Sequence, residues 1–219
     1  MLNFACNVVP GRAFCRRLID STCKVKQSWH IIRVSVEMKA DLQVLLTFLK
    51  DYNEVSVMLD QFWTSNETLQ LFTDRSGGIG NGFGIFFNNK WTHGKWSAHW
   101  VENEILRDIT FLELFPVVVA LEIWGTNLQN KKILFNIDNQ AVVAILNKIS
   151  CKVPRIMYLV RRLVLLSLRF NILIKVQHIA GSSNGIADAL SRCNFQPFRK
   201  LFPFADQYPE VIPYHLWQI

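Results

Sequence analysis

The sequence has no segment that is long and apolar enough to cross a membrane, and no pattern of paired cysteines. Its longest apolar runs, FPVVVALEIW and LVLLSL, are shorter than the roughly 20 apolar residues that a transmembrane helix needs. The five cysteines are an odd number without a C-x-x-C pair, and no signal peptide precedes them, which argues against a disulfide framework or a zinc knuckle. We therefore expect an intracellular protein of the cytoplasm or nucleus that is not secreted and contacts no membrane.

Acidic residues are scarce, with 17 Asp and Glu against 24 Lys and Arg, which gives a formal net charge of +7. They are absent altogether between Asn139 and Ala187. That stretch contains the basic residues Lys148, Lys152, Arg155 and Lys175. An excess of positive charge favours an acidic partner, most simply nucleic acid, although some of these side chains could serve only to keep a helix soluble. Because half of the residues are hydrophobic, the chain has ample material for a folded core.

The chain divides into three stretches of different character. Residues 1–66 predict a helical segment whose main helix spans 35–53, where leucines recur at helical spacing. Residues 67–193 predict an α/β domain with the element order βββαβααβα. Residues 194–219 are rich in proline and aromatic residues and predict an extended tail without a core of its own.

Within 67–193, β-prone runs and helical patterns alternate between turn residues. Three consecutive antiparallel strands are predicted first, separated at Gly77 and Gly78, at Asn88 and Asn89, and at His93 and Gly94. The predicted strands are 69–74, 82–91, 95–101, 132–138 and 171–178, and the predicted helices are 110–128, 139–148, one that begins after Pro154, and 185–192.

Four acidic residues stand where predicted strands end or predicted helices lie. Asp74 closes the first strand, Asp138 closes the fourth, Glu113 lies in the first turn of the helix between them, and Asp188 lies on the last helix. If these carboxylates converge, their mutual repulsion requires compensating cations. Ligands that are all oxygen atoms point to a hard divalent ion, magnesium first and manganese second.

Each acid also has a plain structural explanation when it is taken alone. Glu113 completes the pattern T-x-x-E with Thr110, which is a common way to cap a helix start. Asp138 could cap the following helix, Asp74 could form a turn before SGG, and Asp188 could be an exposed helix residue. Only the joint placement of the four residues in one ordered domain favours a metal site.

Four motifs, TDRSG, ITFLELFPVVVAL, NIDNQAVVAIL and HIAGSSNGIADALSR, carry these acids in this order. Together they resemble the ribonuclease H domain of retroelement reverse transcriptases, most closely that of DIRS-type retrotransposons. The resemblance extends over nearly the whole chain, since residues 1–66 look like the connecting segment that follows a polymerase. It implies a ribonuclease H-like fold, in which a mixed five-stranded sheet is flanked by helices and preceded by a helical segment.

The resemblance also implies an activity, which is endonucleolytic cleavage of the RNA strand of RNA–DNA hybrids. Asp74, Glu113, Asp138 and Asp188 would hold two Mg²⁺ ions, with Mn²⁺ as the alternative, one ion activating a water and the other stabilising the leaving oxygen. The implied partners are the hybrid itself and, within the same element, a reverse transcriptase polymerase domain and a tyrosine recombinase. The candidate contacts to nucleic acid are Arg75, Ser76, Asn139, Lys148, Lys152, Arg155, Lys175 and Asn184.

Three departures from the family pattern keep a second hypothesis open. Arg75 stands where the family favours a small residue, so that it would pair with Asp74 unless strand alternation directs it away from the site, which is the orientation we expect. Ser182 and Ser183 occupy positions where cellular ribonucleases H usually carry a histidine. The chain also lacks a polymerase palm with its own pair of aspartates. The alternative is therefore a catalytically impaired, nucleic-acid-binding remnant of such an element.

Overall fold

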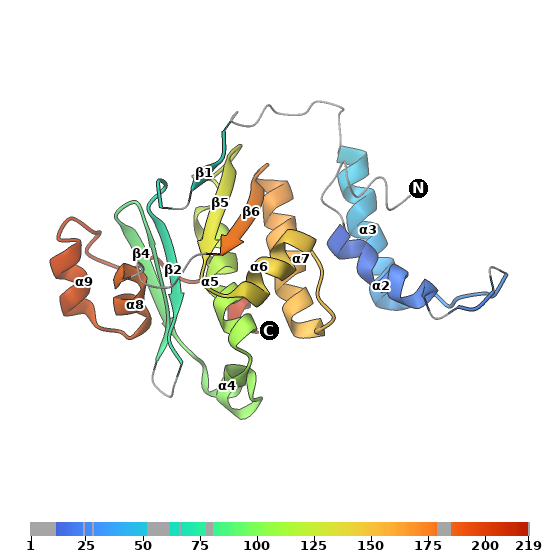
Figure 1. Ribbon diagram of the computed structural model, residues 1–219, viewed down its shortest axis with the longest axis horizontal. Coiled ribbons are helices and arrows are strands. Elements are labelled where there is room, and N and C mark those ends of the chain that lie inside the picture. Colours follow the sequence, from blue (N-terminus) through green and yellow to red (C-terminus); the bar gives the residue numbers. More distant parts are fainter. Residues whose placement is uncertain are drawn as a thin grey trace.

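The computed structural model describes residues 12–23, 25–27, 29–51, 62–65, 67–77, 81–178 and 185–218. Two helices come first, followed by strands and helices that alternate along the chain (Figure 1). The strands are β1 Thr64–Ser65, β2 Leu71–Arg75, β3 Gly82–Phe87, β4 Lys90–Lys95, β5 Lys132–Ile137 and β6 Leu173–His178. The helices are α2 Arg12–Thr22, α3 Val36–Asp51, α4 Ala98–Glu102, η1 Ile105–Arg107, α5 Ile109–Trp124, α6 Gln140–Lys148, α7 Pro154–Arg169, α8 Gly185–Ser191, α9 Phe195–Leu201 and η2 Tyr214–Trp217.

The strands form two hydrogen-bonded sheets of three strands each. In one sheet β2, β3 and β4 run antiparallel, and in the other β1, β5 and β6 run parallel. The prediction of a mixed α/β fold flanked by helices is confirmed. The hydrogen-bonded ladders differ from the expected single five-stranded sheet: among the described strands no ladder joins β2 to β5, and the short strand β1 pairs with β5 at Ile133 and Leu134.

The three antiparallel strands are confirmed, but the predicted position of the third was wrong. Asn88 and Asn89 both adopt positive φ, 45° and 72°, and form the two-residue turn between β3 and β4. The third strand therefore begins at Lys90 and not at Lys95. The following run is the short helix α4, because the side chain of Ser97 accepts a hydrogen bond from the amide of Trp100 and caps its start.

Alternate residues of β3 belong to the two faces of the antiparallel sheet. Phe83, Ile85 and Phe87 join the main hydrophobic core, to which α5 and α7 contribute. Phe86 faces the other way and packs with Leu190 of α8 and with α9 in a second, smaller cluster. Figure 1 shows the sheet between these two sets of helices, with α8 and α9 on one side and α5, α6 and α7 on the other. All six residues of β3 are buried because both of its faces are covered.

Helix α5 crosses the main core and is apolar nearly all round, as expected for a helix that is enclosed on most sides. Its first turn is capped by Asp108, whose carboxylate accepts a hydrogen bond from the amide of Phe111 at 3.0 Å. The capping pair of Thr110 and Glu113 considered from sequence is therefore wrong. Since capping falls to Asp108, the side chain of Glu113 can make contacts elsewhere.

The N-terminal helices pack against α7 through a buried carboxylate. Helices α2 and α3 contact each other, and α2 contacts α7. Asp41 of α3 is 4% exposed and accepts from Arg17 of α2 at 2.9 Å, while Arg161 of α7 lies 3.6 Å away. Arg161 thus serves packing between helices. Arg162 does so too, because its guanidinium pairs with Glu122 of α5 at 3.0 Å.

The C-terminal residues 194–219 are not the extended tail that the sequence predicted. Phe195–Leu201 form α9, and Phe198 is fully buried. Farther on, the chain follows β4, where the amide of Glu210 donates to the carbonyl of Trp91 at 2.8 Å and the hydroxyl of Thr92 donates to the carbonyl of Glu210 at 2.7 Å. Some of the aromatic residues of this segment, such as Phe198 and Phe202, pack on the domain, whereas Phe204, Tyr208 and Tyr214 remain exposed.

The last turn, η2, closes the main core with the ring of Trp217. Its centroid lies 5.8 Å from those of Phe83 and Phe115 and 5.7 Å from that of Trp100. Among the described residues, no helix is long and apolar enough to span a membrane.

We predict that Trp217→Ala lowers the free energy of unfolding by about 3 kcal/mol, because it removes a large ring from an aromatic cluster. The matched control is Tyr214→Ala, which changes a side chain 76% exposed on the same turn and should alter stability by less than about 0.5 kcal/mol. Urea denaturation of both variants measures the difference. Equal stability of the two variants would show that the C-terminal turn does not belong to the core.

Candidate active site

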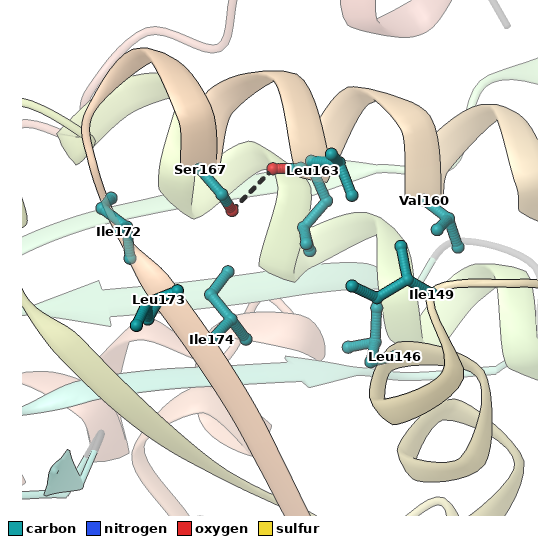
Figure 2. A pocket seen from close by; sticks show the side chains of 9 residues that line it. Leu146, Ile149, Val160, Leu163, Ser167, Ile172, Leu173 and Ile174 are labelled. Atoms are coloured by element: carbon teal, nitrogen blue, oxygen red, sulfur yellow. Dashed lines mark hydrogen bonds between the residues drawn. The ribbon is translucent and has the colours of Figure 1, made fainter. Parts of the chain in front are cut away.

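The structure has a pocket that is lined by apolar residues and by none of the acidic residues. It is a cavity of about 80 Å³ between the end of α6, helix α7 and strand β6 (Figure 2). Its one polar side chain, Ser167, donates its hydroxyl to the carbonyl of Leu163 at 2.8 Å and has no hydrogen to offer a ligand. The other lining residues are Leu146, Ile149, Val160, Leu163, Val164, Ile172, Leu173 and Ile174. Such a surface offers no chemistry, which directs attention to the carboxylates.

The structure brings the four predicted acids into one electrostatic neighbourhood. Asp74 lies near the end of β2, Glu113 in α5, Asp138 directly after β5 and Asp188 in the first turn of α8. The negative charges of Asp188 and Asp138 both act on Asp74, and those of Asp138 and Asp74 both act on Glu113. Segments that are distant in sequence thus bring four carboxylates close enough for their charges to interact.

Helix α8 approaches the sheet closely at Gly84, and this contact positions the residues of α8 relative to Asp74. Gly84 is the cross-strand partner of Asp74, so the two residues share one face of the sheet. A Cβ atom at Gly84 would lie 2.3 Å from the Cβ of Leu190 and 2.7 Å from both the carbonyl oxygen of Ala187 and the amide of Ser191. Only glycine allows this contact, which sets Asp188 and Ser191 beside Asp74.

Asp74 is a largely buried carboxylate that receives a hydroxyl. Burial raises the pKa of Asp74 to about 6, the hydrogen bond from Ser191 lowers it, and the charges of Asp188 and Asp138 raise it. The Ser191 oxygen lies 2.8 Å from Oδ2 of Asp74 and 2.9 Å from the carbonyl oxygen of Asp188, so its single hydrogen serves one acceptor at a time. Sequence analysis missed Ser191, although its place three residues after Asp188 on a helix puts both on one side.

Glu113 is paired with Arg75. The Nε of Arg75 donates to Oε1 of Glu113 at 2.8 Å, and the two side chains are 21% and 14% exposed. Burial raises the pKa of Glu113 to about 7 even though the hydrogen bond and charge of Arg75 lower it, and Asp138 and Asp74 raise it further. The buried carboxylate therefore retains much of the cost of its charge despite the ion pair.

Our expectation that Arg75 points away from the site was wrong, although strand alternation holds. Arg75 does lie on the sheet face opposite to Asp74, since its cross-strand partner is Phe83 of the main core. That face is the one covered by α5, and α5 carries Glu113. The candidate site extends over both faces at the end of β2, so a residue directed away from Asp74 still enters it.

Asp138 and Asp188 form the more exposed side of the site. Asp138 is exposed, and the cap of α6 is Asn139, whose side chain accepts from the amides of Ala141 and Val142, so the capping role considered for Asp138 was wrong. Asp188 is 47% exposed and pairs with Arg192, one turn later, at 2.8 Å. The ring of His178, at the end of β6, has its Nε2 3.1 Å from the carbonyl oxygen of Asp138.

The donor chemistry of the site suits a hard divalent cation, but its side chains are turned towards other partners. Asp74 faces a hydroxyl, Glu113 faces Arg75 and Asp188 faces Arg192. In the described part of the chain, no three His, Cys, Asp or Glu side chains are arranged so that they could hold a metal ion. Carboxylate oxygens fit magnesium in kind, although Glu113 and Asp188 each have one oxygen engaged by a guanidinium.

The candidate nucleic-acid contacts fall into two groups. Arg75, Ser76 and Asn139 are engaged within the protein, the first with Glu113, the second buried with its carbonyl accepting from Trp96, and the third as a helix cap. The exposed basic residues are Lys148 at the end of α6, Lys152 in the next loop, Arg155 in the first turn of α7 and Lys175 on β6. The ammonium of Lys175 lies 6.0 Å from the ring centroid of Trp63. Asn184, Ser182 and Ser183 lie outside the described residues.

Comparison with solved structures finds two ribonucleases H among the similar chains. One is the N-terminal RNase H domain of a Mycobacterium tuberculosis protein, solved as a fusion with maltose-binding protein; it is 14% identical over 60% of this chain and 95% of its own, with a TM-score of 0.40. The other is RNase H1 of the halophilic archaeon Halobacterium salinarum, 16% identical over 58% of this chain and 95% of its own, with a TM-score of 0.40. No family model matches the chain, and no curated protein matches its sequence.

We predict that Gly84→Ala destabilises the protein by about 1–3 kcal/mol, because the added methyl group meets the backbone of α8 and forces it away from the sheet. Gly185→Ala is the matched control, since a Cβ there meets nothing within 4 Å. Thermal denaturation measures stability. The rate at which the Ser191 hydroxyl exchanges its hydrogen with solvent, measured by NMR, reports whether α8 has moved away from Asp74. Equal behaviour of the two variants would contradict close packing at Gly84.

Proposed function

We propose that this chain is a metal-dependent endoribonuclease of the ribonuclease H type, which cleaves the RNA strand of RNA–DNA hybrids. The observation that supports this most is the gathering of Asp74, Glu113, Asp138 and Asp188 from four separate elements. Burial raises the pKa values of two of them, so their charges are held together at a cost in free energy. Side chains arranged in this way are expected where a ligand, here a cation, compensates the charge.

The proposed ligands of two Mg²⁺ ions, or of Mn²⁺, are these same four carboxylates. Bound divalent ions would supply Lewis-acid activation of water and charge stabilisation at the phosphate. The protein contributes the arrangement of the acids. The Ser191 hydroxyl orients the carboxylate of Asp74. Helix α5 and strand β2 keep Glu113 and Asp74 largely out of bulk water, and electrostatic interactions are stronger in the protein interior than in water.

The proposed substrate surface follows the exposed basic residues near the end of α6 and the start of α7. Lys148, Lys152 and Arg155 lie close in sequence, and no acidic residue occurs between Asn139 and Ala187. Phosphates of a hybrid provide complementary charge, and the shape of its backbone and the 2′-hydroxyls of RNA provide selectivity without base sequence. Following the resemblance in sequence, we place the domain (67–193) in a DIRS-type retroelement with a polymerase before it and a tyrosine recombinase as partner.

One observation favours the second candidate, a nucleic-acid-binding remnant without efficient catalysis. Glu113 is held by Arg75, and the described carboxylates do not adopt a metal-binding arrangement. A remnant would keep the basic surface and the fold but would not cut. Binding and cleavage must therefore be measured separately.

For catalysis, we predict that the purified chain cleaves the RNA strand of a labelled hybrid in magnesium or manganese and not in chelator. Asp74→Asn should abolish cleavage while leaving the melting temperature within a few degrees, because the amide keeps the shape and removes the charge that attracts a cation. Asp206→Asn, in the exposed C-terminal segment, is the control and should cleave like the parent. Parental activity in Asp74→Asn refutes the catalytic role, and hybrid binding without cleavage by the parent supports the remnant.

For binding, we predict that affinity for the hybrid falls steeply with salt, because displaced counterions drive association. Replacing Lys148, Lys152 and Arg155 together with alanine should reduce the slope of log K against log salt by about 2.7, since each lost phosphate contact lowers it by about 0.9. The matched control removes three other exposed lysines, Lys39, Lys95 and Lys200. Fluorescence anisotropy over a salt series gives both slopes, and an equal reduction in the two triple variants places the basic surface elsewhere.

A further inference from the structure

Arg75 is a basic residue that lies among the four acidic side chains of the candidate site rather than at their edge. Its guanidinium donates to Glu113 at 2.8 Å, and its charge also acts on Asp74. By contrast, Arg192, which directly follows α8, is 58% exposed and pairs with Asp188 of that helix. Arg75 is thus a partly buried cation that acts on Asp74 and Glu113, the two more buried acids of the four.

The turn after β2 leaves room for this guanidinium. A Cβ atom at Gly77 would lie 3.3 Å from Nη1 of Arg75, so the head group packs directly on the glycine backbone. The main core at Phe83 lies across the strand from Arg75 and limits movement on that side. The side chain is therefore held between Gly77 and Glu113 in a defined position.

A guanidinium and a divalent cation compete for the same charge. The carboxylate of Glu113 presents two oxygens, and Arg75 takes Oε1. A second cation brought close to Glu113 is repelled by Arg75, and this repulsion is strong because both side chains are shielded from water. A metal ion is consequently attracted most strongly to Glu113 once the guanidinium of Arg75 has moved away.

We propose that Arg75 is an internal counter-ion that holds Glu113 in the metal-free protein and releases it when divalent ions bind, so that Arg75 sets the metal affinity of the site. This regulation rests on the proposed function only in assigning metal binding to the same carboxylates. Arg75 is a positioning residue in this scheme, since it acts through Glu113. Its replacement should strengthen metal binding, whereas loss of a ligand would weaken it.

The test measures Mn²⁺ binding to the full chain without nucleic acid, by electron paramagnetic resonance or calorimetry. Arg75→Ala and Arg75→Gln should each bind Mn²⁺ at least tenfold more tightly than the parent. Arg75→Gln keeps an N–H donor for Glu113 while removing the charge, so it guards against a failure of Arg75→Ala to fold. The control Arg107→Ala removes the same charge from a side chain that is 78% exposed and pairs with Glu104, and should stay within twofold of the parent.

A second readout follows Arg75 in the parent protein. Its Nε–H resonance should be protected from solvent exchange in chelator, because the group donates to Glu113, and should lose that protection as Mg²⁺ is added. Affinities of both Arg75 variants within twofold of the parent, or an unchanged Arg75 resonance at saturating Mg²⁺, overturn the counter-ion role and leave the nuclease proposal standing. Absence of divalent binding in the parent and in every variant overturns both.

Discussion

The contact between α8 and β3 at Gly84 is the constraint on which the arrangement of the site depends. Backbone atoms of α8 lie where any side chain at position 84 would have to be, and Asp74 is the cross-strand partner of that glycine. A helix so close to the sheet brings Ser191 within hydrogen-bonding distance of Asp74 and sets the charge of Asp188 against it. After a short turn the chain enters α9, whose Phe198 packs on Phe86 of β3. The contact of α8 with the sheet therefore contributes both to the packing of the C-terminal residues and to the placement of Asp188 beside Asp74.

The other half of the site depends on α5 and lies across the strand. Asp74 and Arg75 are consecutive residues of β2 and lie on opposite faces of the sheet, and each meets a different helix. Asp74 interacts with α8, and Arg75 with Glu113 of α5. The end of β2 thus joins the two halves, and the charge of Asp74 still reaches Glu113 around the strand. A rigid strand end between two packed helices fixes the acids more firmly than a loop would.

The sequence predicted the order of the main strands and helices of residues 67–193, because that order follows from periodicity. The charges of the four acids act on one another, and their joint role as metal ligands stays a prediction. Prediction from the sequence failed where tertiary contacts decide. Residues 95–101 have strand propensity, yet the turn at Asn88 and Asn89 had already begun the third strand, and Ser97 starts a helix. Phe198 packs on β3 and β4, and Trp217 packs on the core, which no local pattern reveals. The pairing of Arg75 with Glu113 required knowing which face α5 covers.

The balance of charge distinguishes this group from an ordinary network of ion pairs. Purely structural networks tend to match each buried acid with a base, because an unpaired buried charge is costly. Among the described residues, the ion pairs of the four carboxylates involve two guanidinium groups, those of Arg75 and Arg192, and the side chain of Arg192 is 58% exposed. Burial accordingly raises the pKa values of Asp74 and Glu113 to about 6 and about 7. Protonation relieves this excess in a protein without ligand, whereas a divalent cation relieves it while leaving the acids ionised. In the function that we propose, a divalent cation would take this second route, and Arg75 would be its competitor for Glu113.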